Sequence, residues 1–297
     1  MIIRGTTSLV GLIGWPIAHS LSPIMHNAAA QALGLDLVYV PLPVAPGEVG
    51  EAVRGLPALG FLGANVTVPH KEAVLPFLDE LDGAAQAIGA VNTICVRRSG
   101  ENSPYRRMIL HGTNTDAAGL VADLQAKGIV FAERDCLVLG AGGAARAAVY
   151  ALASKGARVH LFARRAEQAE QVVAQVARYL PVAPASAHQW AELPALVPAL
   201  EAPLIVNATP LGMPPHEDAS PWPAGLPFPA GSFIYDMVYS PPETVLLRQA
   251  RAAGCAAGNG LGMLVQQGAL AFEMWTGIRP DVMVMQQALV DAKSPPP

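Results

Sequence analysis

The stretch that decides the fold is VLGAGGAARAAVYAL, residues Val138 to Leu152. It places Gly140-x-Gly142-x-x-Ala145 directly after an apolar run typical of a buried strand and at the start of an alanine-rich run typical of a helix. A dinucleotide-binding turn needs this order: one glycine for the tight turn, one for close approach to a pyrophosphate, and a small residue for helix–strand packing. Because a tight turn needs glycine for backbone reasons alone, it is the flanking strand and helix that favour a cofactor site.

The end of the next strand, RVHLFARR, predicts which dinucleotide binds. About 20 residues after the glycines, a site for NAD presents Asp or Glu to the ribose 2′-hydroxyl, whereas a site for NADP presents arginine to the 2′-phosphate. Arg164 and Arg165 stand at this position, and the nearest acid, Glu167, is expected in the first turn of the following helix. The sequence therefore predicts NADP, with its phosphates at the helix N-terminus after Gly142.

Short apolar runs alternate with helical patterns on both sides of this motif. VGLIG, PIMHNAAAQALG, LVYVPL, GEVGEAVRGL and GANVTVP are typical of strand, helix, strand, helix and strand, and a hairpin is expected from Val91. The alternation resumes from about Glu133 and ends in two helical patterns. It implies right-handed βαβ crossovers, and therefore an α/β protein with mostly parallel sheets. Between the two regions, TDAAGLVADLQAKG is expected to form a linking helix with Asp116 as N-cap and Gly128 as C′ residue.

Composition limits the partners. The 297 residues are 52% hydrophobic and 14% charged, with a formal net charge of -4, which favours a well-buried globular protein with no electrostatic support for binding nucleic acid or an anionic membrane. A small-molecule partner is expected instead. The three cysteines are odd in number and far apart, which favours reduced thiols in a cytoplasmic protein. The run Leu9 to Ala18 contains glycines and a proline, so we expect a strand and a turn there rather than a signal-peptide core.

Two stretches near the N-terminus suggest a substrate site. In GANVTVPHKEA, from Gly63 to Ala73, an amide, a hydroxyl and the cation of Lys71 gather where a strand ends, which is where open α/β sheets place ligands. In GWPIAHSLSPIMHN, Ser22 before Pro23 is typical of an N-cap, whereas Ser20 is left unexplained by helix capping. Two hydroxyls at a helix N-terminus favour a carboxylate ligand.

These motifs together resemble the shikimate dehydrogenase family. The pieces run in the family's order across nearly the whole chain: HSLSPIMHN from His19, NVTVPHK from Asn65, GAVNT from Gly89, GTNTDAAG from Gly112, GAGGAARA from Gly140, NATPLGM from Asn207, YDMVYSPPET from Tyr235 and GNGLGMLVQQGALAFEMWTG from Gly258. The resemblance implies reversible NADP-dependent oxidation of the ring 3-hydroxyl of shikimate to 3-dehydroshikimate, on the route to aromatic amino acids. It also implies a substrate domain, 1–116 plus 260–297, and a Rossmann-type doubly wound NADP domain, 117–259, with the C-terminal helices returning to the first domain.

The resemblance assigns the site residues motif by motif. Lys71 and Asp116 are implied as a catalytic pair facing each other across the substrate, Ser20 and Ser22 as carboxylate ligands, Thr67, Asn92 and Gln267 as ligands of ring hydroxyls, and Tyr239 as the residue that closes the pocket. A free lysine has a pKa near 10.4 and is a poor base at neutral pH, so Lys71 would need either a pKa lowered by burial or a role as a cation beside the developing oxyanion. With Asp116 in contact, the two groups would titrate as a coupled unit. The cofactor residues would be Gly140, Ala141, Gly142, Gly143, Ala144, Ala163, Arg164, Arg165, Thr209, Met213, Val238, Gly260 and Met263.

Several alternatives stay open. Quinate and aminoshikimate dehydrogenases share this scaffold, and Ser20, Ser22 and Tyr39 are the positions that would discriminate quinate from shikimate. A regulatory NADPH-binding module without catalysis is a further reading, against which the intact Lys71 and Asp116 argue. The stretch Ala163-Arg164-Arg165 departs from the family pattern, which has Asn before the arginine and Ser or Thr after it. No metal is expected, and the chain could be a monomer or a homodimer.

Overall fold

The computed structural model describes residues 2–99, 108–181 and 185–292. The chain divides into two compact units, residues 1–115 with 264–297 and residues 116–263. The polar segment 98–108 lies outside the described residues except at its two ends, and so does the proline-rich C-terminal tail. The chain passes between the units within the first turns of two helices, α5 (Thr115–Ala126) and α10 (Leu261–Thr276).

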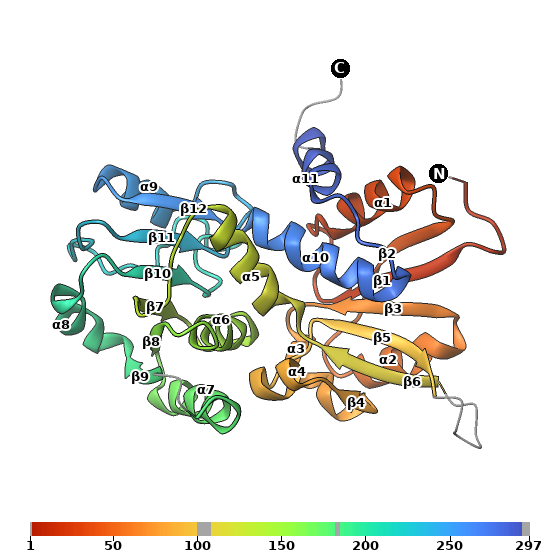
Figure 1. Ribbon diagram of the computed structural model, residues 1–297, viewed down its shortest axis with the longest axis horizontal. Coiled ribbons are helices and arrows are strands. Elements are labelled where there is room, and N and C mark those ends of the chain that lie inside the picture. The colour runs from red at the N-terminus through yellow and green to blue at the C-terminus, as the bar shows by residue number, and fades with distance from the viewer. Residues whose placement is uncertain (1, 100–107, 182–184, 293–297) are drawn as a thin grey trace. The chain divides into compact units, whose positions relative to one another are not determined.

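The first unit contains a six-stranded mixed sheet in the order β2-β1-β3-β5-β6-β4 (Figure 1). Strand β1 pairs in parallel with β2 and β3, and β4 pairs in parallel with β6. The predicted hairpin is β5 and β6, and β5 is antiparallel to both β3 and β6. The strands are β1 (Ser8–Gly14), β2 (Leu37–Pro43), β3 (Phe61–Val66), β4 (Glu80–Leu81), β5 (Thr93–Arg98) and β6 (Met108–Thr113).

This topology brings several loops to one edge of the sheet. Because β5 runs against both β3 and β6, the strands β1, β3 and β6 all point the same way. Their carboxyl ends, Gly14, Val66 and Thr113, therefore lie at one edge, together with the start of β5. All the loops of this unit that carry predicted substrate residues leave from this edge.

Helices cover both faces of this sheet. One face packs against α2, whose apolar residues Val49, Val53 and Leu56 join the buried side chains of β1, β3 and β5. On the other face α11 packs against α1, as Figure 1 shows, so the C-terminal helices return to the first unit as predicted. The helices are α1 (Ser22–Ala32), α2 (Val49–Ala58), α3 (His70–Ala73), α4 (Gly83–Ile88) and α11 (Val282–Asp291).

The second unit contains an all-parallel sheet in the order β12-β11-β10-β7-β8-β9. Counted from β7, this is the 3-2-1-4-5-6 order of the doubly wound dinucleotide-binding fold, so the Rossmann-type prediction is confirmed. The strand order reverses between β7 and β10, which is where such folds bind ligands. The strands are β7 (Asp135–Leu139), β8 (Arg158–Ala163), β9 (Ala185–Gln189), β10 (Leu204–Asn207), β11 (Phe233–Asp236) and β12 (Ala256–Asn259).

Both faces of the second sheet are also covered. Helices α6 (Gly143–Ala153) and α7 (Ala166–Tyr179) pack on one face, as Figure 1 shows. On the other face, α8 (Leu193–Leu196) and α9 (Val245–Ala252) bury leucines against a core that includes Leu137, Leu139 and Phe162. Cys95, Cys136 and Cys255 are all buried free thiols, as expected. Within the described residues, no helix is both long enough and apolar enough to span a membrane.

Two predicted helix starts were wrong, that of α1 by one residue and that of α5 by two. Helix α1 begins at Ser22 with Leu21 as N-cap, so Ser22 does not cap it. Instead the Ser22 N–H donates to Ser20 Oγ at 3.3 Å, and Ser20 is the serine that stabilises this helix start. Helix α5 begins at Thr115, which places Asp116 inside its first turn rather than at its cap. Gly128 adopts the predicted left-handed conformation, with φ of 72°.

Candidate functional site

The serines after β1 lie at the start of α1. Ser22 is buried and Ser20 is half-buried. Pro23, in the first turn, has no backbone N–H that could donate a hydrogen bond. The segment therefore offers hydroxyl groups at a helix N-terminus, an arrangement that suits an anionic group.

Thr67 and Lys71 follow β3 at the same edge. Thr67 packs tightly against the end of β1, since a Cβ on Gly14 would lie 2.4 Å from its Cγ2. Lys71 is half-buried in the short helix α3, and its carbonyl accepts the N–H of Val91 at 2.8 Å. Buried His70 holds α3 in place, with Nε2 2.7 Å from the carbonyl oxygen of Val44. The lysine is thus placed by its own backbone bond and by the side-chain contact of its neighbour.

A buried amide cluster lies beside these loops. Asn92 Oδ1 accepts the Thr115 N–H at 2.7 Å, and its Nδ2 donates to Thr115 Oγ1 at 2.9 Å and to Gln267 Oε1 at 3.2 Å. Gln267 Nε2 donates to the carbonyl of Leu264 at 2.8 Å. Residues 175 positions apart in the sequence are therefore in direct contact, and the structure joins two of the predicted substrate ligands, Asn92 and Gln267.

Asn65, Thr93 and Thr115 of this cluster were not among the predicted ligands. Asn65 is buried, and its Nδ2 donates to the carbonyl of Asn92 at 3.1 Å and to Thr93 Oγ1 at 3.0 Å. Thr115 bridges Asn92 and Gln267. The sequence contained an indication that Asn65 and Thr115 could belong to the site. Asn65 is polar within an apolar strand, and Thr115 lies beside the aspartate of the NTD motif.

The other two predicted residues lie in the second unit. Asp116 is 5% exposed, a degree of burial unusual for a carboxylate. Tyr239 is half-buried in the loop after β11, and burial raises the pKa of its phenol, so it remains a hydrogen-bond donor at neutral pH. The second unit thus contains a buried carboxylate and a phenol that stays protonated.

The glycine turn fits a dinucleotide. Gly140 has φ of 112° and its N–H donates to the carbonyl of Phe162 at 2.8 Å, while a Cβ there would lie 3.0 Å from the carbonyl oxygen of Ala208. The backbone therefore requires glycine at this position whatever binds. Gly142 is the N-cap of α6, and a Cβ there would meet nothing within 4 Å. Glycine at this second position leaves open space at a helix N-terminus, as an approaching pyrophosphate needs.

The predicted 2′-phosphate ligands lie at the carboxyl end of β8. Arg164 and Arg165 are both exposed, Arg165 is the N-cap residue of α7, and Glu167 lies in the first turn of that helix as expected. Ala163, which ends β8, is buried. Two guanidinium groups at this place can form the charge-assisted bonds that a phosphate accepts.

The remaining predicted cofactor residues follow β10, β11 and β12. The Thr209 hydroxyl donates to Asn207 Oδ1 at 2.7 Å, which shapes the loop toward half-buried Met213. The Gly260 N–H lies 3.5 Å from the carbonyl oxygen of Val238, and a Cβ on Gly260 would lie 2.4 Å from the Met237 carbonyl oxygen. Gly260 is thus required for packing, and the buried Met263 follows one turn later in α10.

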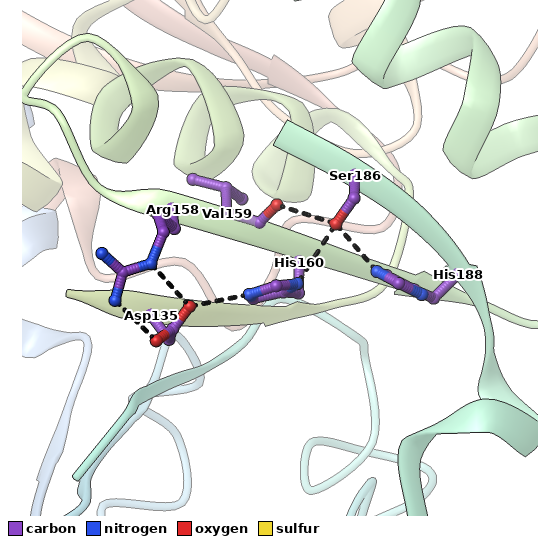
Figure 2. Close-up of polar contacts among 6 residues, drawn as sticks. All are labelled: Asp135, Arg158, Val159, His160, Ser186 and His188. Carbon is purple, nitrogen blue, oxygen red and sulfur yellow. Dashed lines mark hydrogen bonds and ion pairs between the residues drawn. The ribbon is translucent and has the colours of Figure 1, made fainter. Parts of the chain in front are cut away.

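A second polar cluster lies on the β7, β8 and β9 strands (Figure 2). Ser186 Oγ is 3.1 Å from His160 Nδ1, and His160 Nε2 is 2.9 Å from Asp135 Oδ1. This chain of contacts from Ser to His to Asp resembles a hydrolytic triad. However, Ser186 Oγ also contacts His188 Nε2 at 2.8 Å and the Val159 carbonyl oxygen at 3.4 Å. Since the hydroxyl is engaged on three sides, we interpret the cluster as cross-strand bonding that supports the edge strand β9.

Comparison with known proteins identifies the family. Residues 12–94 match the shikimate dehydrogenase substrate binding domain, and residues 260–290 match the shikimate 5'-dehydrogenase C-terminal domain. A protein of Salinibacter ruber (strain DSM 13855 / M31) named shikimate dehydrogenase (NADP(+)) is 47% identical over 296 residues, covering 98% of this chain and 99% of its own.

Solved structures match nearly the whole chain. Shikimate 5-dehydrogenase from Thermus thermophilus, in complex with NADP(H) and shikimate, has a TM-score of 0.80 at 37% identity, covering 96% of this chain and 100% of its own. Quinate dehydrogenase from Corynebacterium glutamicum, in complex with NAD, has a TM-score of 0.85 at 30% identity, covering 96% and 99%. With its fold, its motifs and nearly all of its length shared with these proteins, the chain belongs to the shikimate dehydrogenase family.

Proposed function

We propose that this protein catalyses the reversible NADP-dependent oxidation of shikimate to 3-dehydroshikimate. The observation that carries the proposal is the match of the whole chain, at 47% identity, to a shikimate dehydrogenase (NADP(+)). We further propose that it acts in the cytoplasm, as a monomer or a homodimer. Quinate remains the rival substrate because a quinate dehydrogenase shares the fold.

In this proposal the first unit binds the substrate. Ser20 and Ser22 hold the carboxylate at the N-terminus of α1, while Thr67, Asn92 and Gln267 bind ring hydroxyls. The hydrogen bond that Asn92 donates to Gln267 supports this role, because it fixes both amides before a ligand arrives and reduces the entropy that binding costs. Tyr239 belongs to the second unit, and its proposed role in closing the pocket rests on the family resemblance alone.

The second unit binds NADP in this proposal. The N-terminus of α6 and the open side of Gly142 suit the pyrophosphate, and Arg164 with Arg165 suits the 2′-phosphate. The other contacts follow the carboxyl ends of the strands, where such folds bind dinucleotides. Bound NADP supplies the hydride acceptor. The residues proposed for these contacts are Ala141, Gly143, Ala144, Ala163, Thr209, Met213, Val238, Gly260 and Met263.

Lys71 and Asp116 are the proposed catalytic pair. As hydride leaves carbon 3, the 3-hydroxyl must release its proton, and the oxygen carries negative charge in the transition state. A nearby ammonium stabilises that charge, and a coupled lysine and aspartate can accept the proton as one unit. A positioned acid–base group accelerates such a step by about 10²–10⁴-fold.

The test is the turnover of two separate variants. We expect Lys71→Ala and Asp116→Asn each to lower kcat for shikimate by about 10²–10⁴-fold, because each removes half of the acid–base unit. The matched controls are Lys155→Ala and Asp218→Asn, which change exposed residues outside the proposed site and should keep kcat within about twofold. Either catalytic variant turning over at the rate of its control would refute the assigned roles.

A further inference from the structure

A stack of two buried rings lies behind the amide cluster. His26 of α1 and Tyr39 of β2 are almost completely buried, and their rings lie parallel, with centroids 4.3 Å apart and planes 1° apart. Phe272 and Trp275 of α10 close the stack, with centroids 6.1 Å and 5.6 Å from that of His26. Neither nitrogen of His26 has a hydrogen-bond partner within the described part of the chain. Here the imidazole contributes a flat surface rather than a hydrogen bond.

The residue next to His26 holds the backbone of the same tyrosine. Asn27 Nδ2 donates to the Tyr39 carbonyl at 3.0 Å, and the Tyr39 N–H donates to Asn27 Oδ1 at 2.9 Å. The consecutive pair His26 and Asn27 therefore fixes the ring and the main chain of Tyr39 from one turn of α1. A tyrosine held in this way can direct its hydroxyl to a single acceptor.

That acceptor is Asn65. The Tyr39 hydroxyl donates to Asn65 Oδ1 at 2.9 Å, and both groups are buried. On its other side, Asn65 Nδ2 faces the carbonyl oxygen of Asn92, which can only accept. The orientation of the Asn65 amide is thereby fixed, and only a donor such as a hydroxyl can satisfy its Oδ1.

The bonds continue in one direction to the proposed substrate ligands. Thr93 Oγ1 accepts from Asn65 Nδ2 and donates to Asn92 Oδ1 at 3.0 Å. Asn92 in turn donates to Gln267 Oε1. Each amide and hydroxyl in this series has its donor and acceptor sides set by its neighbour, and Tyr39 supplies the first donor. Removing that donor would leave a buried acceptor unsatisfied and allow Asn65 to tilt away from Asn92.

We propose that Tyr39, clamped by His26 and Asn27, is a positioning residue whose hydroxyl anchors the buried series that presents Asn92 and Gln267 to the substrate. The inference rests on the proposed function for the identity of the substrate, but not for the existence of the series. Tyr39 itself need not touch the ligand. Its contribution reaches the substrate through Asn65, Thr93 and Asn92.

The test is Tyr39→Phe, which keeps the ring and removes only the hydroxyl. We expect the KM for shikimate to rise about tenfold, with the KM for NADP unchanged within about twofold, because the disturbed amides belong to the substrate unit. A purely structural role would lower the melting temperature or the active fraction without this split between the two KM values. The control is Tyr179→Phe at the end of α7, 44% exposed, which should change neither KM. An unchanged KM for shikimate in Tyr39→Phe would overturn the inference.

A second readout works without turnover. In isotope-labelled protein, the side-chain amide resonances of Asn65, Asn92 and Gln267 should shift in Tyr39→Phe and remain in place in Tyr179→Phe. If the wild-type protein oxidises no shikimate but these resonances shift, the proposed function fails and the anchoring role stands. If the Asn92 and Gln267 resonances do not respond to Tyr39→Phe, the anchoring role fails whatever the substrate is.

Discussion

At the scale of single residues, packing and ligand binding constrain neighbouring positions differently. Gly140 is glycine because its backbone conformation and the nearby Ala208 carbonyl require it, whereas Gly142 opens onto free space at the end of a helix. The motif predicted a different role for each glycine, and the structure agrees: Gly140 meets a packing requirement, whereas Gly142 leaves room for a ligand. His26 is a further case: its neighbours are rings, and its nitrogens meet no hydrogen-bonding group among the described residues.

The burial of His26 predicts a dependence of stability on pH. Burial lowers the pKa of His26 from 6.5 to about 3, so between these values the unfolded chain binds a proton that the folded chain does not. The contribution of the neutral His26 ring to the free energy of unfolding is therefore fully present above pH 6.5. It falls by roughly 1.4 kcal/mol for each pH unit between 6.5 and about 3. Urea unfolding between about pH 7.5 and 4.5 should give a shallower pH dependence for His26→Phe than for the wild type. Parallel curves would contradict the assignment of the ring as neutral and buried.

Arg164 and Arg165 predict a change of cofactor preference. Replacing both by alanine removes the charge-assisted bonds proposed for the 2′-phosphate, so the KM for NADP should rise about tenfold or more. NAD has no 2′-phosphate, and its kcat/KM should change less than about threefold. The control is Arg178→Ala, an exposed arginine near the end of α7. Equal losses with NADP and NAD would contradict the role in the 2′-phosphate site.

At the scale of elements, strongly apolar segments were predictable even when short, as β10 and β11 were, whereas short segments without an apolar run were not. The fingerprint strand and helix, β7 and α6, have strong apolar patterns and were predicted from them. By contrast, β9 reads ASAHQ and forms a sheet edge, β12 reads AAGN, and β4 has two residues. Their pairing depends on neighbouring strands rather than on their own composition, so no local sequence pattern predicts them.

Packing between β3 and α10 predicts an effect on stability. A Cβ on Gly63 would lie 2.1 Å from the carbonyl oxygen of Ile94 and 2.4 Å from Nε1 of Trp275, which donates to that same oxygen at 2.9 Å. Gly63→Ala should therefore destabilise the protein by about 1–3 kcal/mol and lower its melting temperature. Gly83→Ala is the matched control, because a Cβ there meets nothing within 4 Å and the residue begins helix α4. Equal melting temperatures for the two variants would contradict this packing.

At the scale of the whole molecule, the alternation of strands and helices predicted two α/β regions, and the structure has two units that each contain one sheet. Local sequence patterns predicted less of the candidate site. Asn92 and Gln267 are joined across 175 positions, and only the resemblance to a family placed them together in advance. The amide of Asn65 was noticed at the end of its strand, but its role and that of Thr115 could not be predicted, because both depend on partners that the fold brings to them.

The initial rate of nicotinamide reduction by the wild-type protein tests the proposed reaction directly. Shikimate and quinate should each be supplied with NADP and with NAD, at matched concentrations. We expect fast reduction with shikimate and NADP, and much slower reduction in the other three combinations. Faster reduction with quinate or with NAD would contradict the proposed substrate or cofactor, and no reduction in any combination would contradict the assignment as a dehydrogenase of this class.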